Sequence, residues 1–532
     1  MCQVDEEYND RLEERTVPTV SQKCVKCKEG SAVLIIRAGD AFCRSCFKEY
    51  FVHKFRAMLG KNRVIYPGEK VLLAVSGGPA SSAMLAQVKE GLSRDAPKKL
   101  RFKPGIIYVD EGGACGQRPE EREQVIAQLE SIFRATGYPF HTVHLEQVFT
   151  LSSSVLEAVS AAPGRPEGSY KAAVDQFIQN SKLDGSGSPG DVSQGQDFAM
   201  QDAQLRLSRL DTRDTPNGTL PFTLQHGQHL ERLLASVMTL TAKEDLLQTL
   251  RQHLVLHTAR AEGYSKVMMG DSCSRLAVKL LSNISLGRGA SLATDTGFSD
   301  PRYGDVVVVR PMRDYSSKEI ALYNRMFGVP SVFIPGLDTK APDKASIQRL
   351  TESFVTKLQA DFPSTVSTIY RTGEKLHTAC PPQNTDSEPS AKCLLCLCAL
   401  DTKVAEEASA FHATLVSERL SQKRVTESPG VRSANTSTPA SGGQCCSSRG
   451  EQDGSCSGGG EGCCSSNRVP PSLDLKSLLC YSCRLTIKDM TALDSLPQYI
   501  ITEAERRNRR FQMKQEISEF LLDEEEDGEE AS

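Results

Sequence analysis

Several features that mark membrane and exported proteins are missing from this sequence of 532 residues. No uninterrupted apolar run approaches the about 20 residues that a membrane-spanning helix needs, so we expect no membrane segment. The opening stretch Met1–Glu7 has neither a basic region nor an apolar core, so we expect no signal peptide. The formal net charge of −4 also argues against a strong nucleic-acid binder acting alone, because neutralising phosphates requires a basic surface.

The eighteen cysteines of the chain therefore need an explanation other than secretory disulfides. Cys24 and Cys27 form one Cys-x-x-Cys pair, and Cys43 and Cys46 form a second pair after fifteen intervening residues. Four thiolates at this spacing can surround one tetrahedral zinc ion, with each pair closing a tight turn. The alternative is four buried thiols that hold no metal. A zinc ribbon usually stabilises a fold and by itself names no reaction.

A second set of paired cysteines lies in the C-terminal third, where Cys393 pairs with Cys396 and Cys480 pairs with Cys483. Loop-closure entropy grows slowly with length, so the long Ser/Gly-rich insertion between the pairs still allows one shared zinc site. Alternatively, the two pairs are independent or redox-active. Five further cysteines lie inside the insertion, and we expect them to be unstructured surface thiols: Cys445, Cys446, Cys456, Cys463 and Cys464.

The chain is organised around the apolar run Val71–Val75 and the small residues that follow it. A continuous apolar run predicts a strand that is buried on both faces, and a helix can start near Ser81. Small residues at this junction let backbone N–H groups approach a phosphate at the helix N-terminus, although no Gly-Lys-Ser/Thr of a Walker loop follows. Alternatively, the turn only preserves the bend. The candidate nucleotide-binding residues of this turn are Ser76, Gly77, Gly78, Ser81 and Ser82.

Further apolar runs separated by helical stretches predict an α/β fold with a doubly wound parallel sheet. Ligands of such sheets lie beyond the carboxyl ends of the strands. Asp110 ends the second predicted strand and is therefore placed to bind a ribose or a metal, or else to cap local structure. The other predicted strands are 105–110, 140–145, 266–269 and 305–311.

Composition and motif positions divide the chain into five parts. We expect a disordered tail, a four-cysteine zinc-ribbon-like module with a linking helix, an α/β domain with a disordered insertion at about 160–226, a C-terminal Cys-x-x-Cys module interrupted at about 406–471, and a charged helix with an acidic tail. The expected bounds are 1–22, 23–60, 61–362, 363–500 and 501–532.

Together, these motifs resemble the PP-loop ATP pyrophosphatases, a class with the adenine nucleotide α-hydrolase-like fold. Within that class, the order of motifs resembles the cytosolic tRNA wobble-uridine 2-thiolation proteins. The resemblance is carried by the N-terminal cysteine ribbon, Ala-Val-Ser-Gly-Gly at 74–78, Val-Asp-Glu-Gly at 109–112, Arg-Pro-Met-Arg at 310–313 with Lys-Glu-Ile at 318–320, and the distal cysteine pairs.

Three departures separate this chain from the active members that it resembles. Ala80 stands where the family has the Asp of Ser-Gly-Gly-x-Asp-Ser. Gly270 is followed by Asp271–Arg275, without the histidine and the two acids of the family's Gly-His-Asn-x-Asp-Asp turn, and no cysteine lies between Gly116 and Gly270. Fewer acids mean fewer Mg²⁺ ligands, and the missing cysteines would carry sulfur or a cluster.

The resemblance therefore implies the second, larger subunit of a heterodimeric thiolation complex in the cytoplasm, itself non-catalytic or weakly catalytic. A PP-loop partner would adenylate the wobble uridine of Lys, Glu and Gln tRNAs with ATP, and a thiocarboxylated ubiquitin-related modifier would supply sulfur. Two alternatives remain: an adenylating enzyme that takes its acids from Asp271 and Glu111, and a zinc-dependent adaptor that binds no nucleotide. Cys273 is interpreted as a small buried residue and not as a nucleophile.

Overall fold

The protein was analysed as a computed structural model, which describes the cysteine modules, the central sheet and most of its helices. The predicted N-terminal tail, most of the 160–226 insertion, the 406–471 tract with its five cysteines, and the acidic run at 523–530 lie outside the described residues. The described residues are 23–36, 40–93, 96, 99–157, 170–183, 224–376, 392–400, 475–488, 490 and 492–518.

A six-stranded sheet forms the centre of the fold, with the strand order β5-β4-β3-β6-β8-β7. Five strands are parallel, and β7 pairs with β8 in the antiparallel direction at one edge. The predicted α/β fold with a doubly wound parallel sheet is confirmed. The strands are β3 (Lys70–Ala74), β4 (Lys103–Asp110), β5 (Phe140–His144), β6 (Lys266–Met269), β7 (Ser299–Asp300) and β8 (Val307–Val309).

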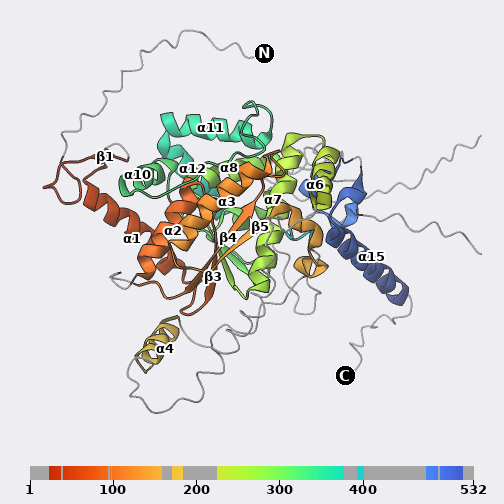
Figure 1. The fold of residues 1–532 in the computed structure, drawn as a ribbon, viewed down its shortest axis with the longest axis horizontal. Coiled ribbons are helices and arrows are strands. Elements are labelled where there is room, and N and C mark those ends of the chain that lie inside the picture. The colour runs from red at the N-terminus through yellow and green to blue at the C-terminus, as the bar shows by residue number, and fades with distance from the viewer. Residues whose placement is uncertain are drawn as a thin grey trace, which may run out of the picture. The chain divides into compact units, whose positions relative to one another are not determined.

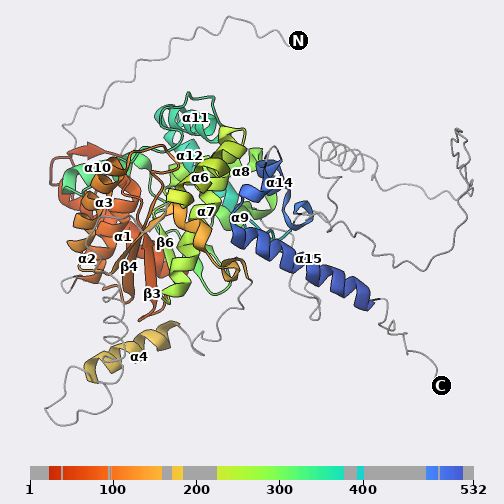
Figure 2. The same cartoon turned by 45° about the vertical axis from the view of Figure 1, so that its right-hand side comes forward.

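Helices cover the sheet on both sides, with α2 and α3 on one face and α7 on the other (Figures 1 and 2). Because β3 lies in the middle of the sheet, its side chains are buried on both faces, which explains its continuous apolar sequence. The helices of this part are α2 (Pro79–Leu92), α3 (Pro119–Arg134), α4 (Tyr170–Leu183), α6 (Leu224–Ser236), α7 (Leu240–Ala261), α8 (Cys273–Ser285), α9 (Leu292–Thr296), α10 (Ser317–Phe327), α11 (Ile347–Asp361) and α12 (Pro363–Lys375).

The N-terminal cysteine module continues directly into the core. A short hairpin of β1 (Leu34–Ile35) and β2 (Ala41–Phe42) precedes helix α1 (Arg44–Asn62). One face of α1 buries Phe47, Phe51 and Phe55, and the Phe51 ring stacks on Tyr323 with 4.0 Å between ring centroids. The module and the sheet therefore share one hydrophobic core.

Strand β7 and helix α12 are among the elements missing from the sequence prediction. Strand β7 has two residues, too few to show a periodic pattern, and α12 packs on α8 through Val366 and Tyr370, which join Leu276 in a small apolar cluster. Residues 363–375 thus pack with the α/β core.

The C-terminal part adds α14 (Tyr481–Ile487) and α15 (Gln498–Ser518).

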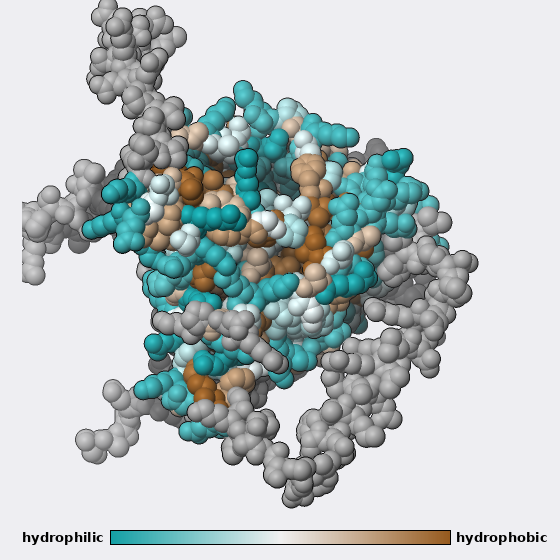
Figure 3. All heavy atoms as spheres, turned by 60° about the vertical axis from the view of Figure 1, so that its left-hand side comes forward, coloured by the Kyte–Doolittle hydropathy of each residue, from teal (hydrophilic) through white to brown (hydrophobic). Residues whose placement is uncertain are grey.

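The surface gives no sign of a membrane segment within the described residues. None of their helices combines the length and the apolar character that spanning a bilayer requires. On the face seen in Figure 3, hydrophilic residues predominate and hydrophobic residues form separate groups.

Replacing Phe51 by alanine tests the packing of α1 on the core. We expect Phe51→Ala to lower the free energy of unfolding by about 3–5 kcal/mol, because a fully buried aromatic side chain leaves a cavity. Phe333→Ala, at a side chain that is 79% exposed, should change it by less than about 0.5 kcal/mol. Urea unfolding followed by circular dichroism measures both, and equal effects would contradict the packing described here.

Candidate functional sites: two cysteine clusters and a cavity at the sheet edge

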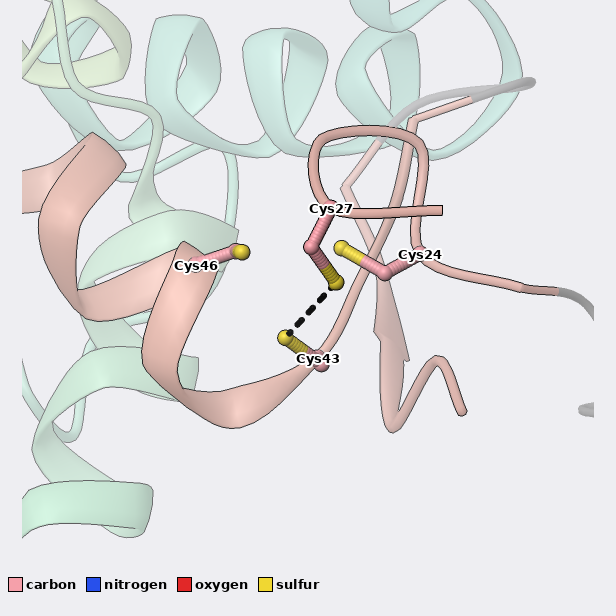
Figure 4. Close-up of side chains that lie close together, drawn as sticks. All are labelled: Cys24, Cys27, Cys43 and Cys46. Carbon is pink, nitrogen blue, oxygen red and sulfur yellow. Dashed lines mark hydrogen bonds between the residues drawn. The ribbon is translucent and has the colours of Figure 1, made fainter. Parts of the chain in front are cut away.

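The four N-terminal cysteines converge on one point. The sulfur atoms of Cys24, Cys27, Cys43 and Cys46 all lie within 4.8 Å of one another, and 3.9 Å separates Cys27 Sγ from Cys43 Sγ (Figure 4). The first pair lies on a turn before the hairpin, and the second lies at the start of α1. This arrangement can hold one metal ion.

The local backbone explains how the first pair closes. Lys28 has a left-handed conformation with φ 62°, and its N–H donates to Cys24 O. Gly30 N–H donates to Cys27 Sγ at 3.4 Å, and a Cβ on Gly30 would lie 3.2 Å from Cys43 Cβ. Only a residue without a side chain fits this close approach easily. The cysteine spacing, the left-handed residue and the glycine therefore form a single knuckle.

The distal cysteines form a second cluster with the same design. The sulfur atoms of Cys393, Cys396, Cys480 and Cys483 also lie within 4.8 Å of one another. Leu397, which directly follows the first pair, has φ 59° and donates its N–H to Cys393 O. In both clusters, the second pair occupies the N-cap and the first turn of a helix, here α14 and previously α1. Of the alternatives for these pairs, the geometry is that of one shared site.

The protonation of the N-terminal thiols shows why such a cluster needs a cation. Burial raises the pKa of Cys24, but hydrogen bonds from backbone N–H groups outweigh it and lower the pKa to about 6. The hydrogen bond to Cys43, together with burial, raises the pKa of Cys46 to about 12. The four thiols therefore cannot all ionise side by side unless a cation neutralises them. A tetrathiolate donor set suits zinc or iron.

The metal content of the purified protein tests whether each cysteine cluster holds one metal ion. We expect the purified chain to carry two metal ions, because each cluster offers four sulfur ligands. Cys43→Ser and Cys480→Ser should each lose one ion, whereas Cys273→Ser, at a buried cysteine outside both clusters, should keep two. Elemental analysis by mass spectrometry gives the count. Two ions remaining in Cys480→Ser would contradict the shared distal site.

The turn after β3 has the shape of a phosphate loop but lacks several of its polar groups. Gly77 has φ 78°, Gly78 is the N-cap of α2, and Pro79 is the first residue of the helix. Proline has no N–H, so this position cannot donate to a phosphate. This effect of Pro79 was not predicted, although a proline at this position can be read from the sequence. Ala80 next to it has no carboxylate.

The hydroxyl groups of this turn bond within the turn itself. Ser81 Oγ donates to Gly78 O at 3.1 Å and lies 3.2 Å from Ser76 Oγ. Ser82 Oγ donates to Gly77 O at 3.3 Å. The structure thus brings the five predicted loop residues together, with their side-chain hydroxyls engaged in holding the bend.

A cavity of about 1160 Å³ opens beside this turn at the carboxyl ends of the parallel strands. Its wall includes the turn, the cavity-facing side of α8 and the distal knuckle at 395–398. Two arginines of the wall pair with acids: Arg251 forms a bidentate pair with Glu111, and Arg310 Nε lies 3.3 Å from Asp271 Oδ2. The two acids that an independent adenylating enzyme would need are both ion-paired.

Asp110 lies at the end of β4 but belongs to a buried network that does not line this cavity. Its Oδ2 atom is 2.6 Å from Arg122 Nη2 and 2.9 Å from His144 Nδ1, and its Oδ1 atom accepts from Gly112 N–H. Burial alone would raise the pKa of Asp110, but the hydrogen bond with His144 and the charge of Arg122 lower it. Arg122 also pairs with Glu146. The geometry therefore favours the structural role for this carboxylate.

Cys273 is the first residue of α8 and is 5% exposed. Burial raises the pKa of its thiol to about 11. This environment is that of a buried apolar residue and not of an activated nucleophile.

The role of Asp110 can be tested through stability. We expect Asp110→Asn to lower the free energy of unfolding by about 3–5 kcal/mol near neutral pH, because it leaves a buried guanidinium short of a partner. A carboxylate with a lowered pKa stabilises the fold above its unfolded pKa of about 3.9 and loses this contribution as pH falls further. The difference from the wild type should therefore narrow below about pH 4 in thermal melts.

Glu121→Gln is the matched control, since Glu121 forms an exposed pair with Arg118. This variant should change stability by less than about 1 kcal/mol. If Asp110→Asn melts like the wild type but loses nucleotide affinity, the carboxylate is a ligand and the structural assignment is wrong.

Comparison with known proteins gives consistent similarity along the whole chain. The family model described as cytoplasmic tRNA 2-thiolation protein 2 matches residues 346–485. Cytoplasmic tRNA 2-thiolation protein 2 of Danio rerio is 62% identical over 99% of this chain and 100% of its own length, and that of Homo sapiens is 52% identical over 99% of both. Among solved structures, the chain has a distant likeness to the U34-tRNA thiolase NcsA from Methanococcus maripaludis with its [4Fe-4S] cluster. The TM-score is 0.43 and the sequence identity is 15%, and the match covers 72% of this chain and 93% of that chain.

Proposed function

The chain belongs to the cytoplasmic tRNA 2-thiolation protein 2 family, and we propose that it is a subunit required for 2-thiolation of the wobble uridine in cytosolic tRNAs. The observation that carries this proposal is the similarity to named thiolation proteins over essentially the full length of both chains. Within the pathway, the tRNAs for Lys, Glu and Gln are the expected substrates.

We assign the chemistry to a PP-loop partner subunit and a supporting role to this chain. The support comes from the turn at β3, where Pro79 offers no N–H and Ala80 offers no carboxylate. Both acids proposed for an independent adenylating enzyme, Glu111 and Asp271, pair with arginines. A heterodimer in which the partner binds ATP and activates the uridine fits these features, with a thiocarboxylated ubiquitin-related modifier as the sulfur donor.

Zinc is the metal that we propose for both cysteine clusters. The clusters use sulfur ligands only and are built on short knuckles and helix starts, as structural zinc sites are. In this role the metal supplies folding free energy and no reaction step. The expected location of the complex is the cytoplasm.

The 2-thiouridine content of bulk tRNA is the measurement that tests the function. Mass spectrometry of tRNA from cells that lack this protein should show the loss of 2-thiouridine, and the wild-type chain should restore it. Normal 2-thiouridine without the protein would refute the proposal and favour a zinc-dependent adaptor in another pathway.

Gly78 offers a way to ask whether this chain uses a bound phosphate. Gly78 has φ −71°, and a Cβ there would meet only Ser76 Oγ, at 3.6 Å. Asp and Asn are both good N-caps, but only Asp places a negative charge where a phosphate would bind. If this chain supports the reaction without a nucleotide, as we propose, both Gly78→Asp and Gly78→Asn restore full 2-thiouridine. Failure of Gly78→Asp alone, at normal protein level, would show that the turn binds phosphate.

A further inference from the structure

Helix α15 (Gln498–Ser518) has two halves with different surroundings. The first half is packed into the fold: Tyr499, Ile500 and Glu503 are at most 3% exposed, and the Tyr499 hydroxyl lies 2.6 Å from His253 Nδ1. Arg507 fixes the middle of the helix by donating to Lys392 O and Leu156 O. The position of α15 is therefore set by the distal cysteine module and by the core.

The second half of α15 extends past these contacts and reaches away from the other described elements (Figures 1 and 2). From Arg509 to Lys514 every residue is exposed, including Phe511 at 63% and Met513 at 59%. Together with Ile517, at 52%, these side chains make several exposed apolar residues on one projecting helix segment, which is the kind of surface that binds a partner.

The charge of this half differs from that of the whole chain. Between Asn508 and Ser518 there are three cationic residues, Arg509, Arg510 and Lys514, and one acidic residue, Glu516, whereas the complete chain has a net charge of −4. The side chain of Arg509 is 71% exposed and only approaches Glu505, at 4.0 Å. Exposed guanidinium groups beside an exposed aromatic ring match RNA, because phosphates pair with the cations and an unstacked base can stack on the ring.

We propose that the second half of α15 binds the anticodon stem-loop of the tRNA, with Arg509 and Arg510 on phosphates and Phe511 stacked on an unpaired base. The choice of tRNA as the occupant rests on the proposed function, and the choice of a loop rests on the aromatic residue, since base-paired RNA offers no exposed base face. The negative net charge of the whole chain is compatible with RNA binding at this site, because the exposed cations are gathered on one short segment of α15.

Binding of the full-length chain to an unmodified lysine tRNA transcript and to its isolated anticodon stem-loop tests this site. Arg509→Gln/Arg510→Gln keeps the helix propensity and removes two charges. The double variant should bind about tenfold or more weakly near 0.1 M salt and lower the slope of log K against log salt by about 1.4, at about 0.7 per lost phosphate contact. Lys61→Gln/Lys99→Gln, two exposed lysines elsewhere, is the matched control and should bind like the wild type.

Phe511→Leu separates stacking from charge, because it keeps an apolar side chain on the helix. We expect about fivefold or weaker binding to the stem-loop with an unchanged salt slope. Phe333→Leu, at another exposed phenylalanine, is its control. Equal affinities of the α15 variants and their controls would overturn the proposal. Loss of association with the PP-loop subunit, at unchanged RNA affinity, would overturn it in favour of a protein partner.

The binding assay and the thiolation assay fail independently. If cells without the protein keep their 2-thiouridine while the stem-loop still binds through α15, the proposed function is wrong and the RNA site stands. If 2-thiouridine disappears without the protein but Arg509→Gln/Arg510→Gln binds tRNA normally, the function stands and the site on α15 is wrong.

Discussion

Two groups of four cysteine sulfur atoms, each group within 4.8 Å, are the constraint on which both cysteine modules depend. Like charges within 4.8 Å of one another repel, and backbone N–H groups relieve only part of that repulsion. At the N-terminal end, the cluster fixes the start of α1, whose phenylalanines fill the core. At the distal end, it joins Cys393–Cys396 to Cys480–Cys483, which places residues 395–398 in the wall of the cavity and gives α15 its anchor at Lys392.

The glycines of the strand–turn–helix junction are required by packing, whether or not a nucleotide binds. A Cβ on Gly77 would lie 2.9 Å from Leu129 Cδ2, and one on Gly270 would lie 2.8 Å from Ser81 Cα. Ala80, where the family that the sequence resembles has Asp, follows the Ser-Gly-Gly sequence on the first turn of α2. A Ser-Gly-Gly sequence in this fold therefore indicates the bend between strand and helix. The residues after it indicate whether the loop carries the polar groups that phosphate chemistry needs.

Much of this architecture is readable from the sequence, since buried parallel strands and paired cysteines leave strong local signals. The strand at 266–269 and the two four-cysteine sets are examples. The partners of Asp110 could not be read, because Arg122 and His144 come from two other elements and meet it only through the strand order β5-β4. Likewise, the exposure of Phe511 depends on where α15 leaves the core, which no periodicity in its sequence encodes.

The distribution of charge differs between the cavity and the exposed half of α15. In the cavity, Arg251 and Arg310 each pair with an acid of the same chain. Lys279 lines the same wall, and burial lowers the pKa of its ammonium group. On α15, by contrast, Arg509 and Arg510 are exposed to solvent. The ion pairs of the cavity stabilise the fold from within, whereas the exposed cations of α15 are the part of the surface proposed to bind tRNA.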